Sequence, residues 1–163
     1  MDIAEIYRAA YGKFSKVTPI AADCGQLCRS RCCRGDSKAG MILFPGEEEI
    51  SSAQRFLRVE TAEMRGIETG FAVCRGRCMR ALRPLSCRIF PYAPKLEDGK
   101  ISVRKDPRAK RICPLLTDDA EEYIQQEFLD TIVEVFEFLR EIPEMDDFLV
   151  EYNAMLDEYE KFL

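Results

Sequence analysis

The two ends of the chain carry the most regular hydrophobic patterns, and both have helical spacing. Within residues 2–14, apolar side chains recur at every third or fourth position: Ile3, Ile6, Tyr7, Ala10, Tyr11 and Phe14. This spacing predicts a short amphipathic helix. In the last third of the chain, one apolar stripe runs over residues 123–139 and a second over residues 145–162, with Pro143 between them. Because proline ends or kinks a helix, the pattern predicts two amphipathic helices that form a hairpin with acidic outer faces.

The middle of the chain is less regular. Residues 41–44, "MILF", predict a short strand that the Pro45-Gly46 pair ends. The acidic run of residues 47–49 then resembles a first helical turn, where negative charge complements the helix dipole. A helix running from there to about Arg58 would bury three apolar side chains: Ile50, Ala53 and Leu57.

One hairpin signal stands out. In "YAPKLEDGKISVRK", residues 92–105, the Asp98-Gly99 pair separates two short runs, and this pair is typical of a two-residue β-hairpin turn. Together these patterns predict an α+β protein with a loop-rich cysteine-cluster core and a small β-hairpin, packed against an acidic C-terminal helical hairpin. With 163 residues the chain is expected to form a single domain.

Charge divides that domain into two parts. Residues 1–116 hold 22 basic and 13 acidic side chains, whereas residues 117–163 hold 2 basic and 16 acidic ones. We therefore distinguish a cysteine-cluster metal-binding part, 1–116, from an acidic α-helical hairpin, 117–163. The amphipathic start lacks the basic and apolar regions of a signal peptide, and no long apolar run is present. A cytoplasmic protein without membrane contact is expected.

The chain contains eight cysteines and no histidine: Cys24, Cys28, Cys32, Cys33, Cys74, Cys78, Cys87 and Cys113. In the cytosol thiols are kept reduced, so a cluster of this kind favours metal ligation over disulfides or simple burial. Each Cys-x3-Cys step places two thiols about one helical turn apart, where both can face one metal. Eight thiols could fill two four-sulfur sites, or one site with four thiols in other roles.

Thiolate ligands suit either zinc or an iron–sulfur cluster. Structural zinc sites commonly use Cys-x2-Cys steps, which this chain lacks, while iron–sulfur clusters accept widely separated cysteines. Radical enzymes that use S-adenosylmethionine need a Cys-x3-Cys-x2-Cys motif, and that motif is absent here.

The order of the motifs resembles a known family. "CGQLCRSRCC", "CRGRCMRALRPLSCRIFPY" and "CPL" are similar to the zinc- or iron-chelating domain family of YkgJ-type cysteine-cluster proteins. That family has a tight cluster ending in a cysteine pair, two spaced cysteines, an Arg-Pro shortly before a Cys-Arg-x-Phe-Pro segment, and a late cysteine. Its first cluster is usually Cys-x2-Cys-x2-Cys-Cys, whereas this chain has x3 twice. The resemblance, which spans about residues 24–114, implies a chelating site made by all eight cysteines and implies no established reaction.

Arginines lie among the cysteines. Arg83 and Arg88 in particular are expected to surround the ligands and balance thiolate charge. Residues 75–111 hold 12 basic and 3 acidic side chains, which also allows a nucleic-acid surface, although few aromatic residues lie between them. The acidic C-terminal helices could instead cover this basic region.

The favoured interpretation is a metal-binding protein that holds iron–sulfur clusters or iron, in an electron-transfer or oxidoreductase-accessory role with a protein partner. The alternative is a zinc-binding structural or metal-handling module that contacts a protein or nucleic acid. A third hypothesis, hydrolysis or group transfer with zinc as Lewis acid, would need a general base. Without histidine, Asp23 or Asp36 would have to serve.

Overall fold

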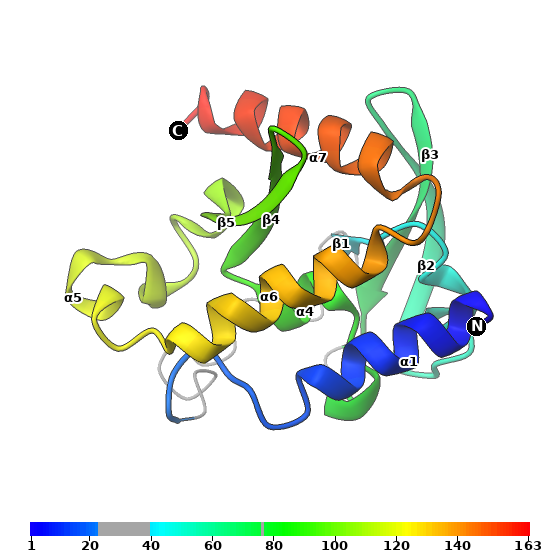
Figure 1. Ribbon diagram of the computed structural model, residues 1–163, viewed down its shortest axis with the longest axis horizontal. Coiled ribbons are helices and arrows are strands. Elements are labelled where there is room, and N and C mark those ends of the chain that lie inside the picture. The colour runs from blue at the N-terminus through cyan, green and yellow to red at the C-terminus, as the bar shows by residue number, and fades with distance from the viewer. Residues whose placement is uncertain (23–39, 76) are drawn as a thin grey trace.

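A computed structural model describes residues 1–22, 40–75 and 77–163 (Figure 1). It confirms a mixed α+β architecture of helices and small antiparallel sheets. The strands are β1 (Gly40–Ile42), β2 (Leu57–Met64), β3 (Ile67–Cys74), β4 (Tyr92–Glu97) and β5 (Lys100–Lys105). The α-helices are α1 (Ile3–Lys13), α3 (Glu48–Ser51), α4 (Leu85–Ile89), α5 (Asp118–Glu121), α6 (Gln126–Leu139) and α7 (Met145–Glu160). The 3₁₀ helices are η2 (Arg80–Leu82), η3 (Pro107–Ala109) and η4 (Pro114–Leu116).

The predicted N-terminal helix is confirmed as α1. It begins at a capping box, in which Asp2 Oδ1 accepts a hydrogen bond from Glu5 N at 2.7 Å and Glu5 Oε2 accepts one from Asp2 N at 3.0 Å. Such a cap satisfies backbone donors that the first helical turn leaves open. The helix then buries Tyr7, Ala10 and Tyr11, as its hydrophobic spacing requires.

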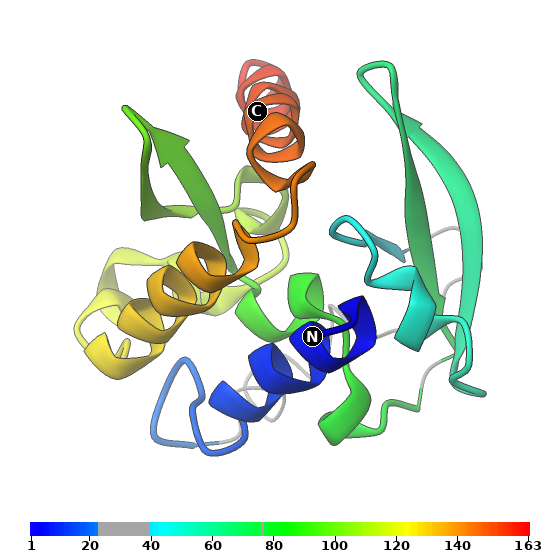
Figure 2. The same ribbon diagram turned by 45° about the vertical axis from the view of Figure 1, so that its right-hand side comes forward.

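A three-stranded sheet of order β1-β3-β2 forms one wall of the molecule (Figure 2). The long β2–β3 hairpin turns at Arg65 and Gly66, both with positive φ, as a tight two-residue β-turn requires. The prediction of a helix to about Arg58 was wrong, because α3 ends at Ser51 and the chain is already extended at Leu57. Pairing with β3 satisfies the backbone of this segment over eight residues, and that tertiary pairing outweighs local helical spacing.

The second sheet is the predicted β4–β5 hairpin, and its turn at Asp98-Gly99 is confirmed. Side chains from the two long C-terminal helices cover its outer edges. Asn153 of α7 accepts from Leu96 N at 2.9 Å and donates to Pro94 O at 2.8 Å, and Glu137 of α6 accepts from Ile101 N at 3.0 Å. Free backbone groups of an edge strand are thereby satisfied.

The main core lies where α1, α4, α6, α7 and β4 meet. Phe44, which follows β1, is 1% exposed and lies at its centre. The centroid of its ring lies 4.8 Å from that of Phe136, 5.7 Å from that of Phe148 and 5.5 Å from that of Tyr152. Both predicted C-terminal helices are therefore present and bury most of their apolar stripes, whereas Tyr123, Tyr159 and Phe162 are exposed. Their main contacts differ, since α6 packs on β5, α1 and β4 and α7 packs on β4, η3 and β2.

Acidic side chains after residue 117 pair with basic ones from the earlier part of the chain. Arg65 pairs with Glu151 and Glu158 of α7 at 2.8 Å each, and Lys13 pairs with Glu134 of α6. Exposed pairs of this kind each contribute at most about 1 kcal/mol to folding, so they orient the helices more than they stabilise them. Among the described helices, none combines the length and the apolar character that a membrane crossing demands.

Candidate metal centre

Four of the eight predicted ligands lie in the described part of the chain. Cys74 is the last residue of β3, Cys78 lies in the loop that follows, Cys87 is on α4, and Cys113 is the N-cap residue of η4. All four are partly buried. The first cluster, Cys24, Cys28, Cys32 and Cys33, and the candidate bases Asp23 and Asp36 lie outside the described residues.

Cys74 and Cys78 flank a small apolar cluster beneath the three-stranded sheet. Its buried members are Leu43, Phe56, Leu57 and Ala72, and both cysteines pack against it together with Leu82. The register of β2 and β3 pairs Leu57 with Cys74, which fixes that cysteine at the end of the hairpin. Gly40, where the described chain resumes after the first cysteine cluster, pairs with Val73 next to Cys74. The sheet therefore places Gly40 beside the end of β3 that carries Cys74.

Arg83 contacts a cysteine sulfur directly. Its Nε donates a hydrogen bond to Cys78 Sγ at 3.2 Å. Hydrogen bonds to a ligand sulfur are among the outer contacts that orient metal ligands. Arg83 thus lies beside one of the four described cysteines, and its role around bound metal stays a prediction.

Arg88 has a different set of partners. Its Nε donates to Arg83 O at 2.6 Å, and its Nη2 donates to Arg80 O at 3.0 Å and to Ala81 O at 2.7 Å. The guanidinium also lies 4.4 Å from the centre of the Tyr11 ring, a cation–π contact. Burial lowers the pKa of Arg88. The charge of Arg83 lowers it further, whereas interactions with Tyr11 and Glu47 raise it. The Arg88 side chain thus fixes the segment between Cys78 and Cys87 by binding the backbone carbonyls of residues 80, 81 and 83.

A buried carboxylate fixes the start of α4, and sequence reasoning missed its role. Glu47 is 0% exposed, and its Oε1 accepts from the Tyr11 hydroxyl at 2.7 Å and from Leu85 N at 2.7 Å, while its Oε2 accepts from Phe44 N at 3.1 Å. Burial raises the pKa of Glu47, although these three donors and Arg88 oppose that effect. In the sequence Glu47 is only the first of three consecutive glutamates, and nothing there separates it from Glu48 and Glu49.

Cys113 lies on the side of the second sheet. Burial raises the pKa of Tyr92, the first residue of β4, and the charges of Glu121 and Cys113 add to this effect. Within residues 1–22, 40–75 and 77–163, no three cysteine or carboxylate side chains come together as a metal-binding group.

Part of the basic region at residues 75–111 is neutralised within the molecule. Arg104 pairs with Asp157 at 2.7 Å and with Glu160 at 3.3 Å, and Lys110 pairs with Glu160 at 2.9 Å. Lys105 pairs with Glu121 at 3.5 Å. The acidic C-terminal segment therefore takes up several of the positive charges that a nucleic acid would need.

Comparison with known proteins found no relative of this chain. No protein-family model matches the chain, no curated protein matches it, and no solved structure matches it.

Proposed function

We propose that the protein binds metal through its cysteines, holding iron–sulfur clusters or iron, and that it transfers electrons or assists a partner oxidoreductase. The observation that carries this proposal is the cysteine pattern itself: eight thiols in two groups, in a chain without histidine. Thiolate sulfur alone is the ligand set of iron–sulfur clusters and of four-cysteine zinc sites. The resemblance of the cysteine motifs to the YkgJ-type family is a second reason for proposing metal chelation.

The surroundings of the described cysteines support it. Cys78 accepts a hydrogen bond from Arg83, and such bonds to sulfur stabilise negative charge on a ligand and tune cluster potential. Arg88 and Glu47 hold the segment between Cys78 and Cys87 through hydrogen bonds to its backbone. A rigid frame of this kind lowers the cost of bringing separated ligands to one metal.

Substitution of ligands tests the proposal. Cys28→Ser and Cys87→Ser should each lower the metal content per chain and the thermal stability together, because metal binding contributes to folding. Ser86→Ala, next to Cys87, is the matched control: it removes a buried hydrogen bond and should lower stability while leaving metal content unchanged. Wild-type metal stoichiometry in both cysteine variants would overturn the assignment.

Zinc is the second candidate, because the same thiolates bind it and the arginines around the site offset the charge of about −2 that four thiolates leave on one zinc. A colourless protein with stoichiometric zinc and no acid-labile sulfide would favour this candidate and a structural or metal-handling role. A coloured protein with iron and sulfide would favour the first.

A further inference from the structure

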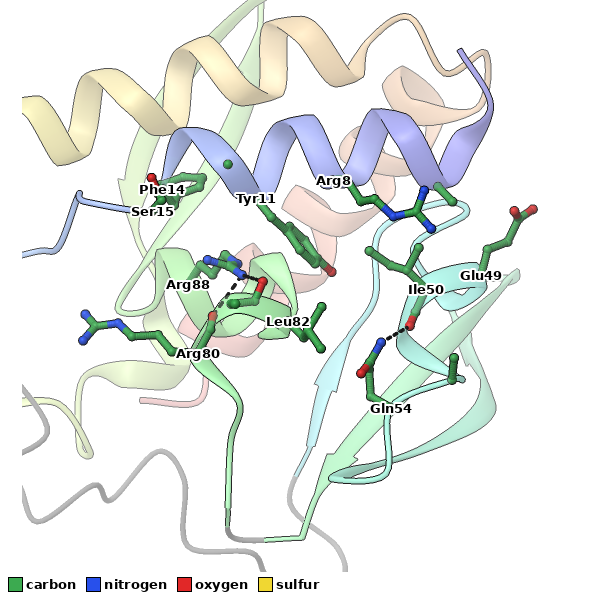
Figure 3. A pocket seen from close by; sticks show the side chains of 14 residues that line it. Arg8, Tyr11, Phe14, Ser15, Glu49, Ile50, Gln54, Arg80, Leu82 and Arg88 are labelled. Carbon is green, nitrogen blue, oxygen red and sulfur yellow. Dashed lines mark hydrogen bonds between the residues drawn. The ribbon is translucent and has the colours of Figure 1, made fainter.

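A pocket of about 510 Å³ lies between α1, α3 and the segment from η2 to α4 (Figure 3). This volume is within the range of small-molecule sites. Its walls are mainly apolar and include Tyr11, Phe14, Ile50 and Leu82. None of the four described cysteines, Cys74, Cys78, Cys87 and Cys113, lines it.

Positive charge gathers around this pocket. Among the described residues, Arg8, Arg80 and Arg88 line it together with one acid, Glu49. Within the described part of the chain, no carboxylate forms an ion pair with any of these three arginines. Several other described arginines, Arg58, Arg65, Arg104, Arg108 and Arg140, do have carboxylate partners. The charge of the buried Glu47 acts on Arg88, but none of the three arginines forms an ion pair with a described carboxylate. The pocket therefore concentrates positive charge, and its low-dielectric walls strengthen the field.

Arg88 is the best organised of the three. Its Nε and Nη2 are bonded to backbone carbonyls and its face contacts Tyr11, whereas Nη1 makes no hydrogen bond with the described residues. A guanidinium held in this way loses little conformational freedom when it binds an anion. Figure 3 shows Arg88 beside Tyr11, with Arg8 toward Ile50 and Arg80 extending to the opposite end of the pocket.

We propose that this pocket binds a small organic anion with an apolar body, such as a carboxylate or phosphate ester. Arg88 binds the anionic group, Arg8 on the other side of Tyr11 adds to the positive charge that attracts it, and Tyr11, Ile50 and Leu82 contact the apolar part. Charge complementarity selects this class: a purely apolar ligand would leave the arginines without a partner, and a cation would be repelled.

Three probes separate the contributions of charge and apolar surface: 1-naphthyl phosphate, 1-naphthol and inorganic phosphate. Titrated into the full-length protein as purified, 1-naphthyl phosphate should bind at one site per chain, at least about tenfold more tightly than either of the other two. Failure of 1-naphthyl phosphate to bind, or equal affinity for 1-naphthol, would overturn the proposal.

Two variants locate the site. Arg8→Ala should weaken binding of 1-naphthyl phosphate about fivefold, since part of the positive charge around the pocket is lost. Arg55→Ala is the matched control: Arg55 is exposed, carries the same charge and lies outside the pocket lining, so its variant should bind like the wild type.

Gly12→Phe blocks the pocket without changing its charge. A Cβ atom at Gly12 would meet no heavy atom within 4 Å, so the larger side chain can occupy the pocket space, and replacing a helical glycine also favours the helix. Binding should fall at least about tenfold while the unfolding transition is retained. Unchanged affinity in both Arg8→Ala and Gly12→Phe would show that the probe binds elsewhere and would overturn the assignment. If Gly12→Phe fails to fold, the affinities of Arg8→Ala and Arg55→Ala for 1-naphthyl phosphate decide whether the probe binds in this pocket.

Discussion

Replacing Glu47 with glutamine tests how the segment before Cys87 is held. Glu47 is buried and accepts hydrogen bonds from the Tyr11 hydroxyl, Leu85 N and Phe44 N, so it joins α1, the start of α4 and the end of β1. Glutamine has nearly the same shape but offers only one acceptor oxygen. The substitution therefore changes hydrogen bonding and charge with little change in packing.

The cost follows from the three contacts. If the amide oxygen keeps the bonds to Tyr11 and Leu85, the amide nitrogen faces Phe44 N, and a buried N–H without an acceptor costs about 1–3 kcal/mol. The two remaining bonds also lose the strength that a charged acceptor gives. Relief of burying a charge offsets part of this loss. We expect Glu47→Gln to lower the free energy of unfolding by about 3 kcal/mol.

Urea unfolding at pH 7, with equal metal content in all samples, measures the change. Glu49→Gln is the matched control because it makes the same charge change two residues later at an exposed position, and it should stay within about 0.5 kcal/mol of the wild type. If the Glu47 and Glu49 variants unfold at the same urea concentration, the buried carboxylate does not hold this segment and the reasoning is refuted.

Three further outcomes are expected. Because burial raises the pKa of Glu47 above its ordinary value of 4.5, the stability that this group contributes is complete below pH 4.5 and declines as the pH rises through the folded pKa. The difference in unfolding free energy between the wild type and Glu47→Gln should therefore shrink as the pH is raised, and a growing difference would contradict the direction of the shift. Asn153→Leu should lower the free energy of unfolding by about 2–3 kcal/mol in urea titrations, since Leu96 N and Pro94 O lose their partner; a change below about 0.5 kcal/mol would refute that role. Arg83→Gln should speed metal loss to a chelator about tenfold, whereas the matched Arg80→Gln should not, and equal rates would argue against a role of the Cys78 contact in metal retention.

The elements with strong periodicity could be predicted from the sequence. The spacing in α1, the two stripes of α6 and α7, and Asp98-Gly99 of the β4–β5 hairpin each carry their own local signal. The β2–β3 hairpin does not, because its turn is Arg65-Gly66 and its exposed face is polar with few bulky side chains. Pairing between strands decides the structure there, and a short stretch of sequence does not reveal which strands will pair.

Site residues divide in the same way. Arginines near cysteines could be expected to contact sulfur, and Arg83 does so at Cys78. The sequence did not reveal that Arg88 has a different role from Arg83. Its hydrogen bonds to the carbonyls of residues 80, 81 and 83 depend on the turn that precedes α4. Glu47 was also indistinguishable, because only the packing of α1 over the Pro45-Gly46 turn encloses one glutamate and leaves its two neighbours exposed.

Elemental analysis tests the central claim most directly. Iron, zinc and acid-labile sulfide would be measured per chain in protein purified without oxygen. The proposal predicts several irons with matching sulfide. Stoichiometric zinc without iron would replace the redox role with a structural or metal-handling one, and a folded protein with neither metal would contradict metal binding by the cysteines.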